Sequence, residues 1–199
     1  MPISQKSPPA KIGFFGGSFD PVHIGHLSIA RQAIEDANLD LLIFCPAYHA
    51  PLRKKQPLLP ASLRFDMLKV IAAENDRMEV SSLELDKQKT CYTYHTVQEI
   101  QKQYPTSKIM LILGSDQFNR LSEWKFSKEL AKLCHFLVFS RTTTHIPSPL
   151  TPDLSYQHIK NNLINCSSTE IRNRIRNNKP VDKMIPNSIL NIFLQFLSR

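Results

Sequence analysis

Two short runs of the chain are almost entirely apolar, and they constrain the fold more than any other feature. Residues 39–44 end shortly before Pro46, and residues 109–113 end at Gly114. Runs of this length and composition are typical of strands that are buried on both faces of a parallel sheet. The longest apolar stretch near the C-terminus, residues 189–197, is too short to cross the ~30 Å hydrocarbon core of a bilayer. We therefore expect a parallel sheet and no membrane insertion.

Helical patterns alternate with these strands along the chain. A strand over residues 11–15, a helix over residues 23–37 and the strand over residues 39–44 make a βαβ unit. The other predicted elements are helices over residues 62–74, 94–103, 167–177 and 188–197, and strands over residues 78–83, 109–113 and 136–139. This alternation predicts a single α/β domain with a Rossmann-like, doubly wound parallel sheet, helices on both faces and closing C-terminal helices.

The length of 199 residues suits one domain. Residues 1–10 are polar and proline-bearing, so we expect a flexible N-terminal extension without a signal peptide, followed by one domain over residues 11–199. Proline-rich residues 46–60 and Thr- and Pro-rich residues 142–152 are predicted loops.

The cysteines form no CxxC pair and no compact disulfide framework; they are Cys45, Cys91, Cys134 and Cys166. Their spacing favours a reducing compartment, and we expect a cytoplasmic protein.

The chain is basic, with 25 Lys and Arg against 17 Asp and Glu and a formal net charge of +8. Such a charge indicates either a solvated basic surface or anionic partners such as nucleotides. The sequence has no RNP motif and no stripe of basic residues interleaved with aromatic ones, so we expect no nucleic-acid partner.

Glycine is concentrated at one place in the chain. Four of the five glycines, Gly13, Gly16, Gly17 and Gly25, fall at the end of the first predicted strand. Glycines there let the backbone reverse tightly and let amide groups approach an anion, while the next helix contributes its positive N-terminus. The segment lacks both GK[ST] and GxGxxG, so it is neither a Walker loop nor a dinucleotide fingerprint. It predicts a phosphate site of another kind.

Two histidines follow these glycines. His23 and His26 are three residues apart near the start of a predicted helix, so they share a face, and we expect Gly25 to leave that face open to a ligand. Both imidazoles can then donate to phosphate oxygens. The alternative is that they only cap the helix or lie on its surface. Residues 19–21, Phe-Asp-Pro, are interpreted as a turn that shapes the loop.

Three segments carry a resemblance to a known family. Residues 16–26, GGSFDPVHIGH, resemble the signature of the nucleotidylyltransferase superfamily, and in particular that of bacterial nicotinate-nucleotide adenylyltransferases. Residues 114–125, GSDQFNRLSEWK, are similar to the family's GxD…W motif, and residues 167–172, SSTEIR, resemble its ISxTxxR motif. The letters HIGH also occur in class I aminoacyl-tRNA synthetases, but the chain has no KMSKS-like loop. With weaker matches elsewhere, the resemblance spans residues 11–196.

The resemblance implies two sets of site residues. The set implied for ATP comprises Gly16, Gly17, Ser18, Phe19, His23, His26, Gly114, Asp116, Ser167, Thr169 and Arg172, of which His23, His26 and Arg172 would be catalytic. The set implied for the nicotinate nucleotide comprises Arg53, Tyr92, Thr93, Trp124 and Arg141. The general alternatives are core packing for Trp124 and a capped basic surface helix for residues 167–172. No protein-held metal is expected, and Mg²⁺ would accompany ATP as the cofactor.

The family's reaction supplies the expected function. A nucleotidyltransferase of this kind transfers the adenylyl group of ATP to nicotinate mononucleotide, giving nicotinate adenine dinucleotide and pyrophosphate in NAD biosynthesis. Two alternatives within enzymes are an acceptor that is nicotinamide mononucleotide or another phosphomonoester such as phosphopantetheine. A third alternative is a noncatalytic nucleotide-binding module. The sequence leaves open whether the protein is a monomer or a homodimer.

Overall fold

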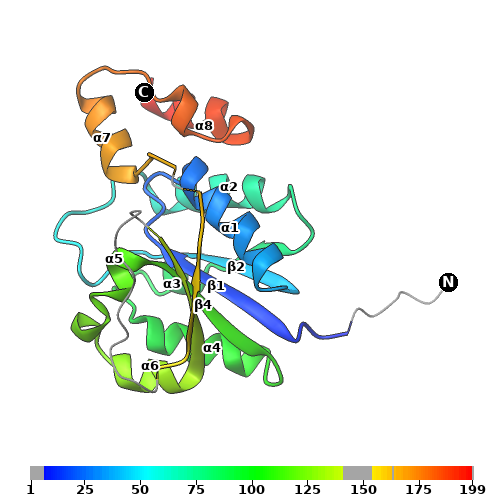
Figure 1. The fold of residues 1–199 in the computed structure, drawn as a ribbon. Coiled ribbons are helices and arrows are strands. Elements are labelled where there is room, and N and C mark those ends of the chain that lie inside the picture. The colour runs from blue at the N-terminus through cyan, green and yellow to red at the C-terminus, as the bar shows by residue number, and fades with distance from the viewer. Residues whose placement is uncertain (1–6, 141–153, 163, 199) are drawn as a thin grey trace.

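The computed structural model, which describes residues 7–140, 154–162 and 164–198, is built on a six-stranded sheet (Figure 1). The strands are β1 (Lys11–Gly17), β2 (Leu41–Pro46), β3 (Met78–Val80), β4 (Lys108–Gly114), β5 (Cys134–Phe139) and β6 (Tyr156–Ile159). Their order is β3-β2-β1-β4-β5-β6, and every neighbouring pair is parallel. The predicted doubly wound parallel sheet is therefore confirmed.

The order of the strands creates a switch point between β1 and β4. From β1 the chain builds outward through β2 to β3, and it then returns to the other side of β1 and continues through β4 to β6. In open α/β sheets, ligands bind beyond the carboxyl ends of the strands at such a point. Gly17 ends β1 and Gly114 ends β4, so the first two sequence motifs meet at this place.

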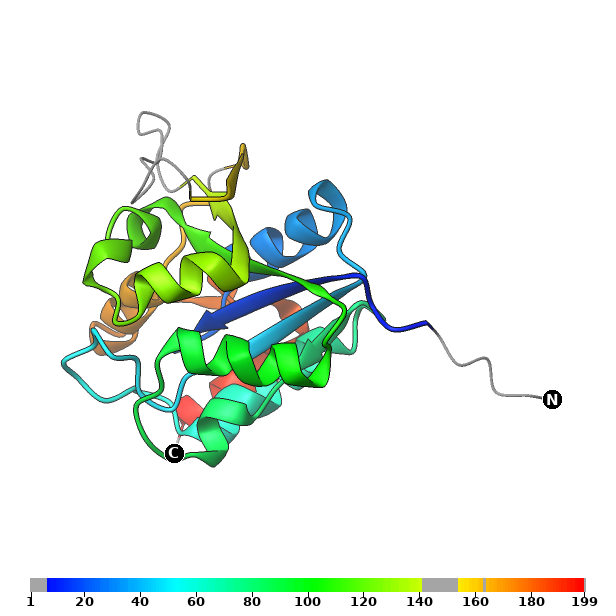
Figure 2. The same ribbon diagram turned by 90° about the horizontal axis from the view of Figure 1, so that it is seen from below.

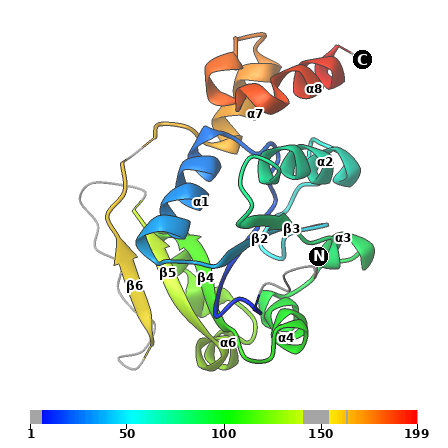
Figure 3. The ribbon, with the colours of Figure 1, turned by 90° about the vertical axis from the view of Figure 1, so that its right-hand side faces the viewer.

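Helices cover both faces of the sheet (Figures 1 and 3). They are α1 (Ile24–Asp36), α2 (Ala61–Ala72), α3 (Leu83–Asp86), α4 (Thr93–Gln103), α5 (Ser115–Phe118), α6 (Ser127–Leu133), α7 (Ser168–Arg176) and α8 (Asn187–Leu197). Helices α1 and α2 lie on one face, with α7 and α8 stacked beyond them, whereas α4 and α6 lie on the other (Figure 3). In the view from below, α4 and α6 lie nearer the viewer, and α7 and α8 lie at the back (Figure 2).

Two hydrophobic clusters occupy the two faces of the sheet. Successive residues of each central strand alternate between them: Phe15, Phe44 and Ile112 belong to one cluster, and Phe14, Ile43 and Leu111 belong to the other. All six side chains are buried. This alternation explains why the central strands are apolar throughout, since both faces of each strand are covered.

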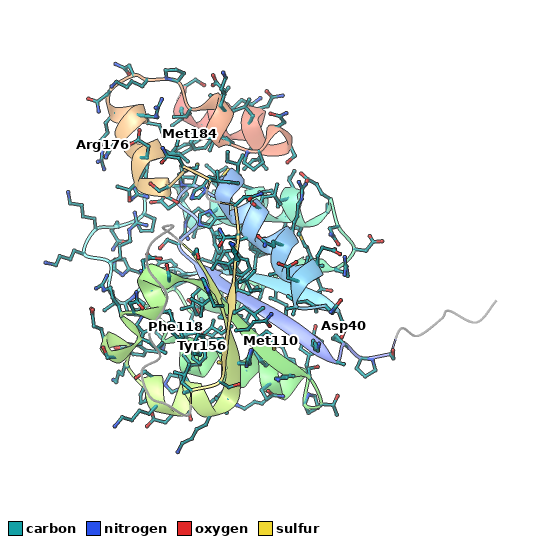
Figure 4. All side chains as sticks on the ribbon, viewed as in Figure 1. Asp40, Met110, Phe118, Tyr156, Arg176 and Met184 are labelled. Atoms are coloured by element: carbon teal, nitrogen blue, oxygen red, sulfur yellow. The ribbon has the colours of Figure 1, made fainter. Side chains whose placement is uncertain are left out.

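Five short elements differ from the sequence-based prediction. The expected strand over residues 78–83 is only Met78–Val80, and α3, α5, α6 and β6 were not predicted. Helices of four to seven residues are too short to display a helical period. Strand β6 is a half-exposed edge strand with the polar sequence YQHI. It is held by tertiary packing, because the rings of Tyr156 and Phe118 lie 5.1 Å apart (Figure 4).

The start of β1 is anchored by polar contacts. The carboxylate of Asp40 accepts hydrogen bonds from the backbone N–H groups of Ala10 and Lys11 at 2.8 Å, and Ser107 Oγ donates to Pro9 O (Figure 4 labels Asp40). The predicted division of the chain into a flexible extension over residues 1–10 and one domain over residues 11–199 stays a prediction. Within the described part of the chain, no helix is both long and apolar enough to span a bilayer.

Candidate active site

The loop between β1 and α1 carries the first motif, and its backbone is unlike the expected glycine turn. All five glycines of the chain are described, and none has a positive φ; the left-handed residue of the loop is Phe19, with φ 45°. The glycines instead make room for rings. A Cβ on Gly16 would lie 3.1 Å from the Phe14 ring, and one on Gly17 would lie 3.3 Å from the Phe19 ring. The prediction that these glycines reverse the chain was therefore wrong.

His23 and His26 form a reciprocal cap at the start of α1. His23 Nδ1 accepts a hydrogen bond from the backbone N–H of Gly25 at 3.1 Å, and His26 Nδ1 accepts one from the backbone N–H of His23 at 3.3 Å. The two rings face each other with centroids 3.8 Å apart. Since both Nδ1 atoms accept, each neutral ring carries its proton on Nε2. The structure thus shows the cap, which orients the same rings as Nε2 donors; whether they also bind phosphate stays a prediction.

Gly25 lies between the histidines, but a neighbouring ring occupies the space beside it. A Cβ on Gly25 would lie 3.0 Å from both Nδ1 and Cε1 of His23. The expectation that Gly25 leaves this face open to a ligand was wrong, because the missing side chain accommodates the buried His23 ring. Gly25 therefore lets the cap form.

We expect Gly25→Ala to destabilise the protein by about 1–3 kcal/mol, because the added methyl group overpacks a buried site. The substitution should displace the His23 ring and lower kcat as well. Thermal denaturation and steady-state kinetics measure the two effects. Ser28→Ala, at a half-buried position of the same helix, is the control for helix propensity. A Gly25→Ala protein as stable and active as the parent would contradict this role.

Asp20 is the central polar residue of the loop, and sequence reasoning treated it only as part of a turn. Its carboxylate is fully buried and accepts hydrogen bonds from the backbone N–H groups of Leu58 and Leu59 at 2.9 and 2.8 Å. It also pairs with Arg53 at 2.6 Å, and Arg172 Nη1 lies 3.7 Å away. Asp20 thereby joins the β1–α1 loop to residues 46–60 and to α7. An acidic residue inside the apolar segment FDPV was the available signal.

Arg172 reaches the same loop from α7. Its Nη1 donates to the backbone carbonyl of Asp20 at 2.7 Å, and its Nη2 donates to Thr169 Oγ1 at 3.1 Å. Burial and the nearby Arg53 charge lower the pKa of Arg172. Ser167 caps α7 by accepting from the Glu170 N–H at 3.1 Å. The first and third motifs therefore meet, as expected. Both Nη atoms of the Arg172 guanidinium, however, already donate to acceptors within the protein.

A second buried arginine stabilises the site and was missed from the sequence. Arg64 on α2 is 1% exposed, and its Nη1 donates to the carbonyls of Ser18 and Ala47 at 2.7 Å each. Its Nε also donates to the Leu59 carbonyl at 3.3 Å. Burial lowers the pKa of this guanidinium. Its place among apolar residues of a helix was the only sequence signal.

A cavity of about 680 Å³ opens beside the carboxyl ends of β1 and β4. The predicted site residues that line it are Gly16, Gly17, Ser18, Phe19, His26, Arg53, Tyr92, Thr93, Gly114 and Trp124. It is also lined by residues that were not predicted, among them Glu84, Cys91, Gln117, Arg120 and Lys125. His23, Asp116, Ser167, Thr169 and Arg172 are not part of the lining. Arg141 lies outside the described residues.

Trp124 has two surroundings at once. It is half-buried against the cluster under α4 and α6, and it also lines the cavity. Core packing therefore describes one part of the Trp124 side chain, and a stacking face open to a ligand describes the other.

Asp116, the acid of the same motif, is exposed on α5, where its carboxylate accepts from Gln117 Nε2 at 3.2 Å.

Glu84 places a carboxyl group in the wall of the cavity. It is 6% exposed and accepts a hydrogen bond from Thr96 Oγ1 at 2.7 Å. Burial raises the pKa of this carboxyl, and the bond from Thr96 opposes the shift only in part. The folded protein therefore holds the Glu84 proton more tightly than the unfolded chain does. It follows that the stability contributed by this group falls as pH rises above its unfolded pKa.

We expect Glu84→Gln to remove that pH dependence, since the glutamine oxygen can still accept from Thr96. The Tm of the variant relative to the parent should increase as pH rises above the unfolded pKa of Glu84 and become constant once the carboxyl is ionised in the folded protein. Differential scanning fluorimetry in a series of buffers from acidic to neutral pH measures the trend. Glu79→Gln, which alters an exposed carboxylate on β3, is the matched control. A difference in Tm that is constant with pH would show that Glu84 is not the titrating group.

Comparison with known proteins agrees with this arrangement. The cytidylyltransferase-like family model matches residues 14–174. A protein of Opitutus terrae named "Probable nicotinate-nucleotide adenylyltransferase" is 37% identical over 181 residues, which cover 90% of this chain and 93% of its own. A protein of the same name from Methylacidiphilum infernorum is 33% identical over 193 residues, which cover 93% of this chain and 90% of its own.

Solved structures show the same fold. Plasmodium falciparum nicotinic acid mononucleotide adenylyltransferase complexed with NaAD matches with a TM-score of 0.75 at 17% identity, over 94% of this chain and 95% of that chain. The same enzyme complexed with APC gives a TM-score of 0.76, over 94% and 96%. Because the sequence matches cover nearly the whole of both proteins at over 30% identity, this chain belongs to the nicotinate-nucleotide adenylyltransferase family of cytidylyltransferase-like proteins.

Proposed function

We propose that the protein transfers the adenylyl group of ATP to nicotinate mononucleotide, giving nicotinate adenine dinucleotide and pyrophosphate. The observation that carries the proposal is one cavity lined by two unlike groups of residues. It is lined both by the β1–α1 loop with His26 and by Tyr92, Thr93 and Trp124. Its volume of about 680 Å³ suits a nucleotide-sized ligand. The names of the relatives supply the substrates.

The reaction needs positioning and charge neutralisation more than covalent chemistry. An oxygen of the 5′-phosphate of nicotinate mononucleotide attacks the α-phosphorus of ATP in line. A new P–O bond forms as the bond from the α-phosphorus to the bridging oxygen breaks, and that oxygen leaves with pyrophosphate. The attacking phosphate is already an anion near neutral pH, so no general base is required.

In this proposal His26 acts directly on the phosphates. Its Nδ1 is held by the His23 backbone, which directs the Nε2 donor away from the cap. A fixed donor costs no reorganisation when charge develops on the phosphate oxygens. The N-terminus of α1 adds favourable potential at the same place. His23 stacks on His26 and holds it, and Arg172 holds the backbone of the loop through the Asp20 carbonyl.

Mg²⁺ enters this proposal as part of the substrate, Mg·ATP. Magnesium at nucleotide sites is commonly bound through phosphate oxygens and water, with few protein ligands. The described residues contain no group of three or more His, Cys, Asp or Glu arranged to hold a metal. The ion would neutralise charge on the phosphates of ATP.

A cytoplasmic location is also part of the proposal.

The test is pyrophosphate release by the purified protein with Mg·ATP. Nicotinate mononucleotide, nicotinamide mononucleotide and phosphopantetheine are supplied in parallel, and the products are identified by mass. Release with the nicotinate nucleotide, and formation of its dinucleotide, is expected. Preference for another acceptor would keep the reaction type and overturn the substrate. Release with none of the three would favour a noncatalytic nucleotide-binding module.

A further inference from the structure

The guanidinium of Arg64 joins the two loops that border the cavity, which follow β1 and β2. Its Nη1 donates to the carbonyls of Ser18 and Ala47 at 2.7 Å each, its Nε to that of Leu59 at 3.3 Å and its Nη2 to that of Tyr48 at 3.4 Å. It is 1% exposed, yet it forms no ion pair with a carboxylate in the part of the chain that the structure describes. Burying a charge is costly unless hydrogen bonds compensate for the lost water. The four carbonyls are therefore held in fixed positions around this side chain.

Two successive carbonyls of the β1–α1 loop are fixed on the side that faces Arg64 and Ala47. The Gly17 carbonyl accepts from the Ala47 N–H at 2.8 Å, and the Ser18 carbonyl accepts from Arg64. Both peptide units are trans, so each N–H points opposite to the carbonyl of its own unit. The N–H groups of Ser18 and Phe19 therefore point away from Arg64 and Ala47. Phe19 is left-handed, with φ 45°, and successive N–H groups at such a turn form a concavity for an anion.

The N–H groups of Ser18 and Phe19 are available to a ligand. Neither has a hydrogen-bond acceptor within residues 7–140, 154–162 and 164–198. Phe19 is only 2% exposed, and a backbone N–H in a buried residue is almost always paired with protein, water or a ligand. Both residues line the cavity, as does His26. A phosphate oxygen in the cavity would supply the missing acceptor.

We propose that Arg64 is a positioning residue for adenylyl transfer, because it holds the Ser18 and Ala47 carbonyls and thereby aims two backbone N–H groups at a substrate phosphate. The inference rests on the proposed function and deepens it. It adds a residue on α2 that the sequence motifs did not single out and that is not part of the cavity lining. The alternative is that Arg64 only stabilises the two loops.

The first experiment replaces Arg64 by lysine and, separately, by glutamine. Both side chains are shorter than arginine and lack its fork of donors, so neither should hold both carbonyls. With Mg·ATP and nicotinate mononucleotide, kcat and KM are measured well below the Tm of each protein, where every variant is folded. We expect kcat to fall about ten- to a hundredfold, and by more than KM rises, since misplaced donors no longer meet the charge that develops in the transition state. Lys69→Ala, which removes an exposed cation from the same helix, is the matched control and should turn over like the parent.

The second experiment observes the two N–H groups directly by nuclear magnetic resonance. Mg·ATP alone and nicotinate mononucleotide alone are titrated into the ¹⁵N-labelled parent and into Arg64→Lys. In the parent, at least one of these ligands should shift the amide signals of Ser18 and Phe19. In Arg64→Lys both shifts should shrink, whereas the amide signal of Gly114, which lines the same cavity, should still respond.

Each outcome decides the question. A folded Arg64→Lys or Arg64→Gln protein with the kcat of the parent would overturn the inference. Ser18 and Phe19 signals that neither ligand shifts in the parent, or that shift equally in Arg64→Lys, would also overturn it. A loss of activity that disappears well below the Tm, or failure of both variants to fold, would assign Arg64 to stability alone. If the parent transfers adenylyl groups to no acceptor, the proposed function fails, and the amide titration then judges the inference by itself.

Discussion

Replacing His26 by alanine is expected to lower kcat about a hundredfold or more, with a small effect on KM for ATP. The imidazole lines the cavity, and the backbone N–H of His23 holds its Nδ1, so the ring presents Nε2 as a fixed donor. Removing one such donor from the site of charge development costs about 10²–10³-fold in kcat. Steady-state release of pyrophosphate measures the loss.

Two variants separate this role from a structural one. His26→Gln keeps an N–H donor close to the position of Nε2, so it should retain more activity than the alanine variant. His135→Ala removes a half-buried histidine near the amino end of β5, away from the carboxyl ends of the strands. It should turn over like the parent. Near-normal kcat in His26→Ala would remove His26 from the mechanism.

Replacing Asp20 by alanine is expected to destabilise the protein by about 3–5 kcal/mol and to lower activity together with stability. The change leaves the N–H groups of Leu58 and Leu59 without their acceptor and leaves Arg53 without its partner. Breaking a buried ion pair from one side carries a cost of this size. For a chain of this length, Tm should fall by about 6–20 °C. Thermal unfolding, followed by circular dichroism, measures the fall.

Asp40 provides the matched control for Asp20. Its carboxylate also accepts hydrogen bonds from two backbone N–H groups at 2.8 Å, but it is exposed and contacts no arginine in the described residues. Asp40→Ala should therefore cost only about 1 kcal/mol. Equal losses in the two variants would mean that burial and the arginines add nothing at Asp20. The role of Asp20 in joining the β1–α1 loop to residues 46–60 and to α7 would then be wrong.

The central part of the fold was predictable from the chain alone. A strand buried on both faces must be apolar at every position, and residues 109–113 satisfy this condition. The long helices α1, α2, α4, α7 and α8 were predicted for a similar reason, because each repeats its apolar residues over several turns. Strand β6 was not, since an edge strand with the sequence YQHI depends on its neighbours more than on its composition.

The site was predictable where residue type and order carry the information. The motif residues at the ends of β1 and β4 lie around one cavity, because parallel strands end at the same edge of the sheet. The backbone of the glycine loop was not predictable, since the left-handed residue is Phe19 and no glycine takes that role. Nor could the sequence place Asp116, which matches its motif but does not line the cavity.

The sequence by itself determined the parallel α/β sheet, the family and the end of the sheet where the site lies. Those properties follow from local pattern and from motifs of adjacent residues. The tertiary structure alone decided the partners of Asp20, Arg64 and Lys125. Buried Asp20 and Arg64 join loops far apart in the chain, whereas Lys125 rests on rings without a carboxylate partner in the described residues. The energy of a charge depends on what surrounds it, and only the folded chain brings those surroundings together.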